Sequence, residues 1–299
     1  MTLLRSFDEF RETARAAALA AGFFDGVHTG HQRILAGAAR RPQSFALTFT
    51  QHPSLLLTPA NPCKILTPLD VRLELLAATG ITGCLLLDFT PELASLSPRE
   101  FVSRLGPNVR SFHCGENWRF GKGGAGTPAF LKGAGFEVET LPPALWRGEP
   151  VSSTRVRAAV CEGALDAAER MLGRPWFIRE TAQPGRAVGR TLGVPTLNFH
   201  PRSEIMPPVG VYAVRVRFAG ERAWRGGVAN YGFRPTFPDR PEAPVLEVHF
   251  FDAPGRETNG LVADTAFVRR LRGERVFESP AALAAQLRAD RAQAAEALR

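Results

Sequence analysis

The hydrophobic pattern of the chain changes its period once, and this change limits the possible folds more than any other sequence feature. In the first part, short apolar runs such as 43–49 alternate with longer helical patterns such as 68–80, which is typical of a parallel α/β sheet. Further on, 209–218 alternates with a period of two, which favours an antiparallel barrel or sandwich. A length of 299 residues fits two domains of ordinary size. We therefore expect one domain over 1–174 and a second over 175–299.

Three alanine-rich or amphipathic segments add detail to this division. Residues 152–173 carry apolar side chains at helical spacing and stop at Gly173, which predicts a closing helix or helix pair of the first domain. Residues 280–299 predict a final helix. Residues 15–22 would form a helix by alanine propensity alone, but their place before a glycine-aromatic turn favours a buried strand.

The chain carries a net positive charge, with 37 lysine and arginine residues against 29 aspartate and glutamate residues. Such an excess suggests polyanions in general, including nucleic acid. Only Lys64, Lys122 and Lys132 are lysines, however, and 269–275 is the only dense arginine cluster. Nucleic-acid-binding surfaces gather basic residues in stripes with interleaved aromatic residues, so we expect neither nucleic acid nor a membrane as a partner.

The cysteines and the apolar runs are those of an ordinary cytoplasmic protein. Cys63, Cys84, Cys114 and Cys161 are spread singly, so neither a zinc site nor a disulfide framework is expected. No apolar run approaches the roughly 18 residues of a membrane-spanning helix, and the N-terminus has no signal-like pattern. The expected compartment is the cytoplasm, and the expected assembly is a monomer or a weak homo-oligomer.

A pair of histidines within 22–35 forms the first candidate site. His28 and His31 flank Gly30 where an apolar-periodic helix begins, so both imidazoles are expected to face one way from its first turn. A helix N-terminus attracts anions, and two histidine donors there can grip a triphosphate. The alternative is that the two histidines only cap the helix. The hydroxyl and cationic side chains of 151–157 favour the phosphate site, because a doubly wound sheet brings such loops to one edge.

A glycine-rich stretch and a polar strand form the second candidate site. The stretch contains Gly185, Gly189, Arg190, Gly193, Pro195, Thr196 and Asn198. Glycines let backbone N–H groups approach phosphates closely, and the Thr196 hydroxyl and Asn198 carbonyl offer neutral oxygen ligands to a hard cation. On 244–252, Glu247 and His249 share one face of a predicted strand, and phosphorylating an alcohol needs help with a proton. The alternatives are a plain loop between strands and a solvated or arginine-paired carboxylate.

The order of the motifs resembles that of one enzyme family. In the first half they are GFFDGVHTGH at 22–31, TFTQHP at 48–53, GENWRFGKGGAG at 115–126 and SSTRVRAAV at 152–160. The first and last are similar to motifs of the nucleotidyltransferase superfamily, and all four in this order resemble the adenylyltransferase module of the bacterial bifunctional riboflavin kinase/FAD synthetase family. In the second half, GRTLGVPTLN at 189–198, GVYAVRV at 210–216, GGVANYGFRPTF at 226–237, LEVHFFD at 246–252 and FVRRLRGERVF at 267–277 resemble the riboflavin kinase module.

The resemblance implies a Rossmann-like nucleotidyltransferase domain followed by a six-stranded antiparallel barrel with a C-terminal helix. It implies that ATP phosphorylates riboflavin to FMN in the second domain and adenylylates FMN to FAD in the first. In the first domain it assigns His28 and His31 to catalysis, Gly22, Phe23, Asp25, Gly30, Asn117, Ser153, Thr154 and Arg157 to nucleotide binding, and Arg119 and Phe120 to a loop over the flavin. In the second it assigns Gly185, Gly189, Arg190, Gly193 and Pro195 to nucleotide binding, Thr196 and Asn198 to Mg²⁺ with ATP, and Glu247 to activation of the riboflavin 5′-hydroxyl. ATP, riboflavin and FMN are the expected partners.

The sequence departs from the family pattern at several loop positions. Thr50 and Gln51 stand where the family usually has an acidic residue and a proline, and Gly124 where it commonly has an arginine. Glu180 stands where a glycine is frequent, and 257–260 replaces an acidic-apolar-Tyr-Gly run. These departures leave open a working adenylyltransferase beside a weak or inactive kinase-like barrel. A third alternative is a flavin- or nucleic-acid-binding regulator, which would bind DNA in a salt-dependent way without turning over riboflavin.

Overall fold

The computed structural model describes residues 1–183, 196–233, 244–252 and 258–299. The chain divides into two compact units, Met1–Ser153 and Thr154–Arg299. Helices α8 (Ser153–Cys161) and α9 (Leu165–Leu172) confirm the predicted helix pair. In this division the pair falls almost wholly in the second unit, whereas the sequence places the boundary after residue 174. The boundary at 174 stays a prediction.

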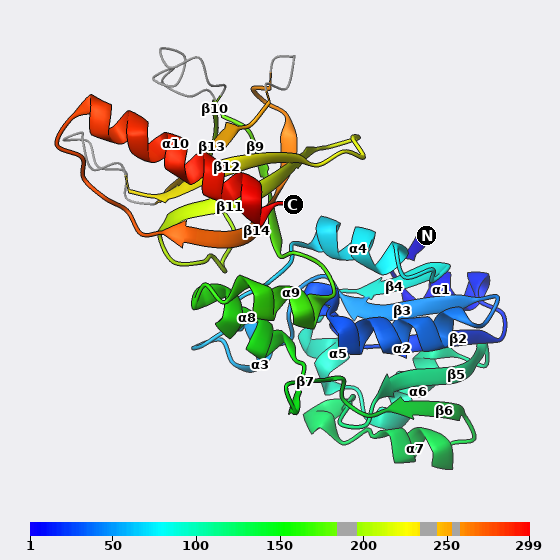
Figure 1. Ribbon diagram of the computed structural model, residues 1–299. Coiled ribbons are helices and arrows are strands. Elements are labelled where there is room, and N and C mark those ends of the chain that lie inside the picture. The colour runs from blue at the N-terminus through cyan, green and yellow to red at the C-terminus, as the bar shows by residue number, and fades with distance from the viewer. Residues whose placement is uncertain (184–195, 234–243, 253–257) are drawn as a thin grey trace. The chain divides into compact units, whose positions relative to one another are not determined.

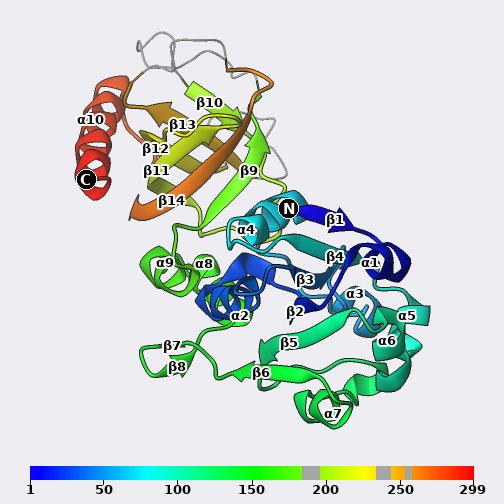
Figure 2. The same ribbon diagram turned by 90° about the vertical axis from the view of Figure 1, so that its right-hand side faces the viewer.

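A six-stranded parallel sheet forms the centre of the first unit (Figures 1 and 2), as predicted. Its strands are β1 (Thr2–Leu4), β2 (Ala17–Ala21), β3 (Ser44–Phe49), β4 (Gly83–Leu87), β5 (Val109–Gly115) and β6 (Glu137–Leu141), in the order β1-β4-β3-β2-β5-β6. The connecting helices are α1 (Phe7–Thr13), α2 (Thr29–Ala39), α3 (Ser54–Leu57), α4 (Leu69–Ala77), α5 (Pro91–Ser95), α6 (Pro98–Leu105) and α7 (Pro128–Gly133). A short hairpin of β7 (Leu145–Trp146) and β8 (Glu149–Pro150) follows.

Strand β2 lies at the point where the strand order reverses. The chain moves from β2 through β3 to β4 on one side of the sheet and then crosses to β5 on the other side. All five residues of β2 are buried, which confirms the predicted strand despite its alanine content. Open α/β sheets bind their ligands at such a switch point, so a site is expected at the carboxyl ends of β2 and β5.

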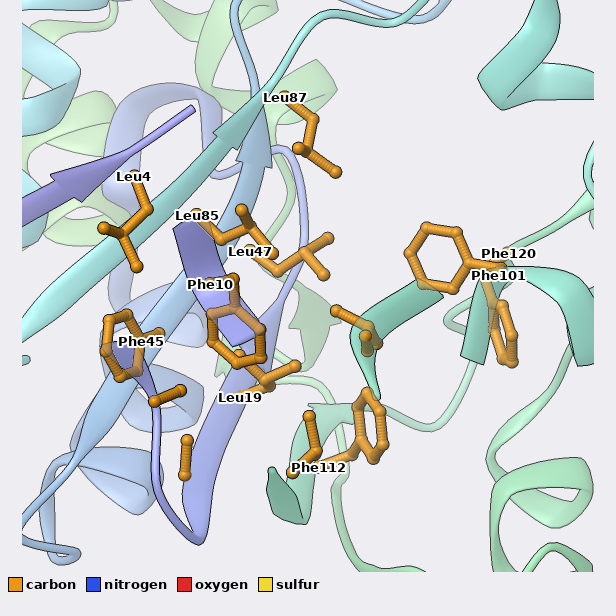
Figure 3. Close-up of a cluster of buried hydrophobic side chains, with 14 of the residues drawn as sticks. Leu4, Phe10, Leu19, Phe45, Leu47, Leu85, Leu87, Phe101, Phe112 and Phe120 are labelled. Carbon is orange, nitrogen blue, oxygen red and sulfur yellow. The ribbon is translucent and has the colours of Figure 1, made fainter. Parts of the chain in front are cut away.

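Two hydrophobic clusters cover the faces of this sheet. Figure 3 shows the first, in which Phe10 of α1 packs against Leu19 and Phe45. The rings of Phe10 and Phe45 meet edge to face, with centroids 5.3 Å apart. The second cluster places Leu35 of α2 and Leu76 of α4 against Ala18 and Ala20 of β2. Small side chains on this face of β2 let α2 approach closely, and each buried Leu or Phe stabilises the fold by about 1.5–3 kcal/mol.

A six-stranded antiparallel sheet forms the second unit, again as predicted. Its strands are β9 (Phe177–Thr181), β10 (Thr196–Phe199), β11 (Gly210–Phe218), β12 (Arg225–Gly232), β13 (Val245–Phe250) and β14 (Val262–Arg272), in the order β10-β13-β12-β11-β14-β9. A bridge between Gln183 and Asn198 joins the chain just after β9 to β10, so the sheet curls into a partly closed barrel. Alternate residues such as Tyr212 and Phe250 fill its inner face.

Helix α10 (Pro280–Ala297) confirms the final helix predicted for 280–299, and it covers the outer face of this sheet. Its Ala294 packs against Val211, Ala213 and Val228, which alternate with the inner residues. Figure 1 shows the helix lying across β11 and β12.

Candidate active sites

The loop that follows β2 has an unusual backbone. Phe24 and Val27 have φ angles of 61° and 40°, in a region that residues with a side chain rarely adopt, and Gly26 between them has a φ of 77°. Conformations of this kind persist only where neighbouring contacts hold them, and they concentrate at functional sites. The loop leads directly into His28, the residue before α2.

Asp25 supplies several of these contacts from inside the loop. Its carboxylate is buried and accepts the backbone N–H groups of Leu66 and Thr67 at 3.1 Å. Its carbonyl oxygen accepts the Ser153 hydroxyl at 2.9 Å. Asp25, assigned to nucleotide binding by resemblance, thus joins three segments of the first unit around the loop.

The histidine pair lies at the start of α2. His28 caps the helix, because its Nδ1 accepts the His31 backbone N–H at 3.3 Å. A neutral His28 with Nδ1 as acceptor carries its proton on Nε2. The two rings stack, with centroids 3.5 Å apart and an angle of 18° between their planes. An added Cβ at Gly30 would lie 3.2 Å from the His28 ring, so glycine makes room for the stack.

His31 has an unsatisfied polar atom. Its Nδ1 is buried and has no hydrogen-bond partner among the residues that the structure describes. Burial, and to a lesser extent the nearby His28, lower the pKa of His31 well below its usual value. The free ring is therefore neutral at pH 7, with one nitrogen available as a donor or acceptor. Capping and anion binding are thus compatible at this site, since His28 serves the helix and His31 keeps a free nitrogen.

Two of the remaining nucleotide-binding candidates lie on α8. Thr154 is exposed, and its hydroxyl accepts the Arg157 guanidinium at 3.3 Å. Gly22 continues the β2 ladder by donating to the Leu47 carbonyl at 3.1 Å, and half-buried Phe23 follows it.

The loop after β5 was expected to close over a ligand, and its three candidate side chains differ in exposure. Asn117 and Arg119 are exposed, as their assignment requires. Phe120, by contrast, is buried in the first hydrophobic cluster and stacks on Trp118 with ring centroids 4.7 Å apart. Its backbone also pairs with that of Gly126 in both directions. Phe120 therefore anchors this loop to the core.

Polar residues meet on one face of the barrel sheet. Asn198 of β10 lies directly opposite Glu247 of β13, and Glu247 lies opposite Asn230 of β12. Thr196 lies opposite His249 in the same way. Residues opposite each other on antiparallel strands point to the same side of the sheet, so all five share one face.

Burial differs along this polar face. Asn198 is buried and Glu247 half-buried. Burial lowers the pKa of His249, against an opposing effect of Glu247. Asn230 was not a candidate from the sequence, since only the strand register places it beside Glu247.

Five candidates of the glycine-rich stretch fall outside the described residues. They are Gly185, Gly189, Arg190, Gly193 and Pro195. Within the described parts of the chain, no three His, Cys, Asp or Glu side chains gather to hold a metal ion, and no helix is long and apolar enough to cross a membrane.

Family models match the chain in two consecutive parts, FAD synthetase over residues 10–155 and riboflavin kinase over residues 172–298. A bifunctional riboflavin kinase/FMN adenylyltransferase of Bacillus subtilis is 35% identical and is covered to 93% by 95% of this chain. Proteins of the same name from Pseudomonas fluorescens and Escherichia coli K12 are 37% and 32% identical, each covered to 97%.

A solved structure, described as a macrolide-efflux protein from Streptococcus pneumoniae, has the same architecture. It matches with a TM-score of 0.82 and 28% identity over 96% of both chains. The likeness in structure thus extends over both units, and the likeness in sequence extends over nearly the whole of the named relatives. The chain belongs to the family of bifunctional riboflavin kinase/FMN adenylyltransferases.

Proposed function

We propose that this protein makes FAD from riboflavin in two steps, each in its own unit. The barrel unit transfers the terminal phosphoryl group of ATP to riboflavin, giving FMN and ADP. The parallel-sheet unit then transfers AMP from a second ATP to FMN, giving FAD and pyrophosphate. The observation that carries the proposal is the contrast between the two candidate sites. The barrel face holds the half-buried carboxylate of Glu247, which can take the proton that an alcohol must lose, whereas the Asp25 carboxylate at the histidine site is buried and accepts backbone N–H groups.

Adenylyl transfer needs no strong base in the first unit. A phosphate monoester loses its second proton near pH 6, so the FMN phosphate is already a nucleophile at neutral pH. One of its oxygens attacks the α-phosphorus of ATP, and the bond from that phosphorus to the departing pyrophosphate breaks. Positioning and fixed charge stabilisation are then the main contributions of the protein.

The residues assigned to adenylyl transfer divide these tasks. His28 and His31 donate to the phosphate oxygens at the positive end of α2. Gly22, Phe23 and Gly30 let the backbone approach the nucleotide, and Asp25 holds the loop that carries them. Asn117, Ser153, Thr154 and Arg157 bind the triphosphate, while Arg119 on the loop anchored by Phe120 approaches the flavin.

Phosphoryl transfer in the second unit requires a proton acceptor. Glu247 takes the proton of the riboflavin 5′-hydroxyl while the hydroxyl oxygen attacks the γ-phosphorus of ATP, and ADP leaves. Asn230 and Asn198 lie on either side of Glu247 on the neighbouring strands and orient its carboxylate.

Mg²⁺ is proposed to enter the second unit with ATP. The hydroxyl of Thr196 and the amide oxygen of Asn198 share one face of β10, and both are neutral oxygen donors of the kind that Mg²⁺ accepts beside phosphates. A cation bound there would neutralise charge on the β- and γ-phosphates.

One observation bears on the alternative of an inactive kinase. Glu180, where the family often has glycine, accepts the backbone N–H of Arg202 at 2.7 Å. Burial raises the pKa of Glu180, and this contact opposes the rise. The side chain thus has a local structural partner, which favours an active barrel over an obstructed one.

A time course tests the function. The purified protein is incubated with riboflavin, ATP and Mg²⁺, and the flavins are separated by chromatography. FMN is expected first and FAD after it. If FAD forms only from added FMN and riboflavin stays unchanged, the inactive-kinase alternative is correct. If neither FMN nor FAD forms, both enzyme hypotheses are excluded.

A further inference from the structure

Arg72 of α4 is a buried cation beside the first site. It is 1% exposed and is the largest fully buried side chain among the described residues. Its guanidinium donates to the carbonyl oxygen of Phe23 at 3.2 Å, to that of Phe49, and to that of Thr50 at 3.4 Å. Its Cζ also lies 4.1 Å from the centroid of the Phe23 ring. One side chain thus joins the segments that follow β2 and β3.

The location of these carbonyl groups explains why a cation is used. The backbone hydrogen bonds between β2 and β3 end where Gly22 donates to Leu47, and the two strands are not paired beyond this point. The Phe23 carbonyl also accepts the Thr48 hydroxyl at 2.8 Å. Arg72 therefore continues the connection past the last backbone hydrogen bond, with the fixed fork geometry that only a guanidinium offers.

Burying this charge is costly unless something compensates it. Burial lowers the pKa of Arg72 to about 10, against the opposing influence of Asp25, so the side chain stays cationic at neutral pH. No carboxylate is hydrogen-bonded to the guanidinium in the contacts described above. A hydrocarbon side chain would fill the same space at lower cost, which indicates that the donors of Arg72 have a task.

That task is suggested by the strained loop that begins at Phe23. Phe24 and Val27 hold positive φ angles, and each such residue costs on the order of 1–3 kcal/mol. Asp25 anchors the middle of the loop and Arg72 anchors its first carbonyl. The loop ends at His28, so its path decides where the stacked histidine rings lie.

We propose that Arg72 is a positioning residue for adenylyl transfer, which maintains the strained loop after β2 and thereby the placement of His28 and His31. It also fixes Phe23, whose ring contacts the guanidinium and meets the His52 ring edge to face. The proposal rests on the adenylyltransferase function proposed above and assigns Arg72 no contact with substrate.

The test uses full-length Arg72→Met and Arg72→Lys, with Arg104→Met as the control. Methionine keeps much of the volume without donors, and lysine keeps the charge without the fork. Arg104 is exposed on α6, so its variant makes the same chemical change outside the loop. The kcat and KM for FAD formation from FMN and ATP, the thermal unfolding midpoint and the imidazole NMR signals of His28 and His31 are measured for each.

Misplacement by about 1 Å can cost about 100-fold in rate, so the kcat of Arg72→Met should fall by about that factor. The KM of Arg72→Met should change little, and added guanidinium ion should restore part of its rate. The kcat of Arg72→Lys should lie between those of Arg72→Met and the parent protein. Arg104→Met should match the parent protein. Wild-type kcat in Arg72→Lys, or a loss in Arg72→Met that matches only its unfolded fraction, would overturn the proposal.

The same variants separate this proposal from the proposed function. If Arg72→Met does not fold, the kcat of Arg72→Lys decides. If the parent protein makes no FAD, the function fails, and the NMR signals decide about Arg72. Shifted signals of His28 and His31 in Arg72→Lys, with unshifted signals in Arg104→Met, support the positioning role, and unshifted signals in both overturn it.

Discussion

The Nδ1 of His31 is buried without a hydrogen-bond partner among the described residues, and the proposed adenylyl transfer gives the His31 ring a direct role in charge stabilisation. Removing one hydrogen-bond donor from a charge-stabilising site typically costs about 100- to 1,000-fold in rate. We predict that His31→Ala lowers FAD formation from FMN by about this factor, while FMN formation from riboflavin continues. Chromatography of both reactions measures the effect.

His200 provides the control for this substitution, because it is an exposed histidine outside both candidate sites. His200→Ala should leave both rates unchanged. Undiminished FAD synthesis in His31→Ala would mean that the histidine pair only caps α2.

Glu247 is the corresponding side chain in the barrel. A positioned general base contributes about 100- to 10,000-fold, and glutamine keeps the size of glutamate while losing its basicity. We predict that Glu247→Gln lowers FMN formation within this range and leaves FAD formation from supplied FMN intact. Glu162→Gln, at an exposed position directly after α8, is the matched control. A loss in FMN formation of less than about tenfold would exclude Glu247 as the base.

Helix α10 is joined to the barrel by a buried ion pair. Asp290 is 1% exposed and accepts the Arg272 Nη2 at 2.7 Å and the Gln286 amide at 2.8 Å. Breaking such a pair leaves a buried charge uncompensated, which costs about 3–5 kcal/mol. We predict that Asp290→Ala lowers the free energy of unfolding of the second unit by this amount, as measured by urea denaturation.

A double variant distinguishes the ion pair from simple loss of packing. Arg272→Met with Asp290→Leu removes both charges and should recover most of the stability, since apolar replacements of buried pairs are often neutral. If Asp290→Ala costs less than about 1 kcal/mol, the pair behaves like an exposed one and does not hold the helix.

The contact between α2, β5 and β6 is expected to depend on pH. His113 of β5 is buried, with its Nε2 3.2 Å from the Ser111 hydroxyl and its Nδ1 3.2 Å from Glu139 of β6. Burial lowers the pKa of His113, Glu139 opposes this, and Arg40 and Arg41 of the α2 end add to the lowering. The unfolded chain, with an ordinary histidine pKa of about 6.5, therefore binds the proton more readily than the folded chain.

It follows that His113 contributes stability above about pH 6.5, and that this contribution is lost as the pH falls towards its lower folded pKa. We predict that protection of the β5 amides against hydrogen exchange falls between about pH 7 and pH 5, and that His113→Gln flattens the fall. His200→Gln is the control, and equal pH dependence in the parent protein and His113→Gln would contradict the assignment. His31, whose pKa is also lowered, is present in both proteins and does not affect the comparison.

Elements with a strong period or a distinctive neighbour could be predicted from the sequence. The helix at 69–77, the helix pair after residue 152 and the buried strand at 17–21 were all found, the last because its position outweighed alanine propensity. The histidine pair was placed at a helix start because an apolar-periodic pattern begins there.

Residues whose roles depend on contacts between distant segments could not be predicted in this way. A charged residue in a helical pattern is normally assigned to the solvent side, so the buried position of Arg72 gave no signal. Asn230 required the register of β12 on β13, and Phe120 lay in a loop motif although its ring packs in the core. In each case the missing information was a tertiary contact.

At the scale of the whole molecule, the two units differ in architecture. Each has its own sheet, and the sheets share no strand. The first unit has two hydrophobic clusters of its own, and the barrel has the cluster beneath α10. Both proposed reactions use ATP, and FMN is the species that the first reaction must pass to the second.

This separation predicts complementation between two inactive variants. A chain with His31→Ala still forms FMN but not FAD, and a chain with Glu247→Gln converts FMN to FAD but does not form FMN. Neither alone should turn riboflavin into FAD at more than a small fraction of the parent rate. Mixed in equal amounts with riboflavin, ATP and Mg²⁺, they should form FAD after a lag, because FMN released by one chain must first accumulate for the other.

The length of the lag is the informative quantity. It should shorten as the concentration of the His31→Ala chain rises, and it should disappear when FMN is added at the start. Each variant alone, at the total protein concentration of the mixture, is the control for residual activity. No FAD in the mixture, while added FMN is converted normally, would contradict free release of FMN and would show that the intermediate passes only between the two sites of one chain.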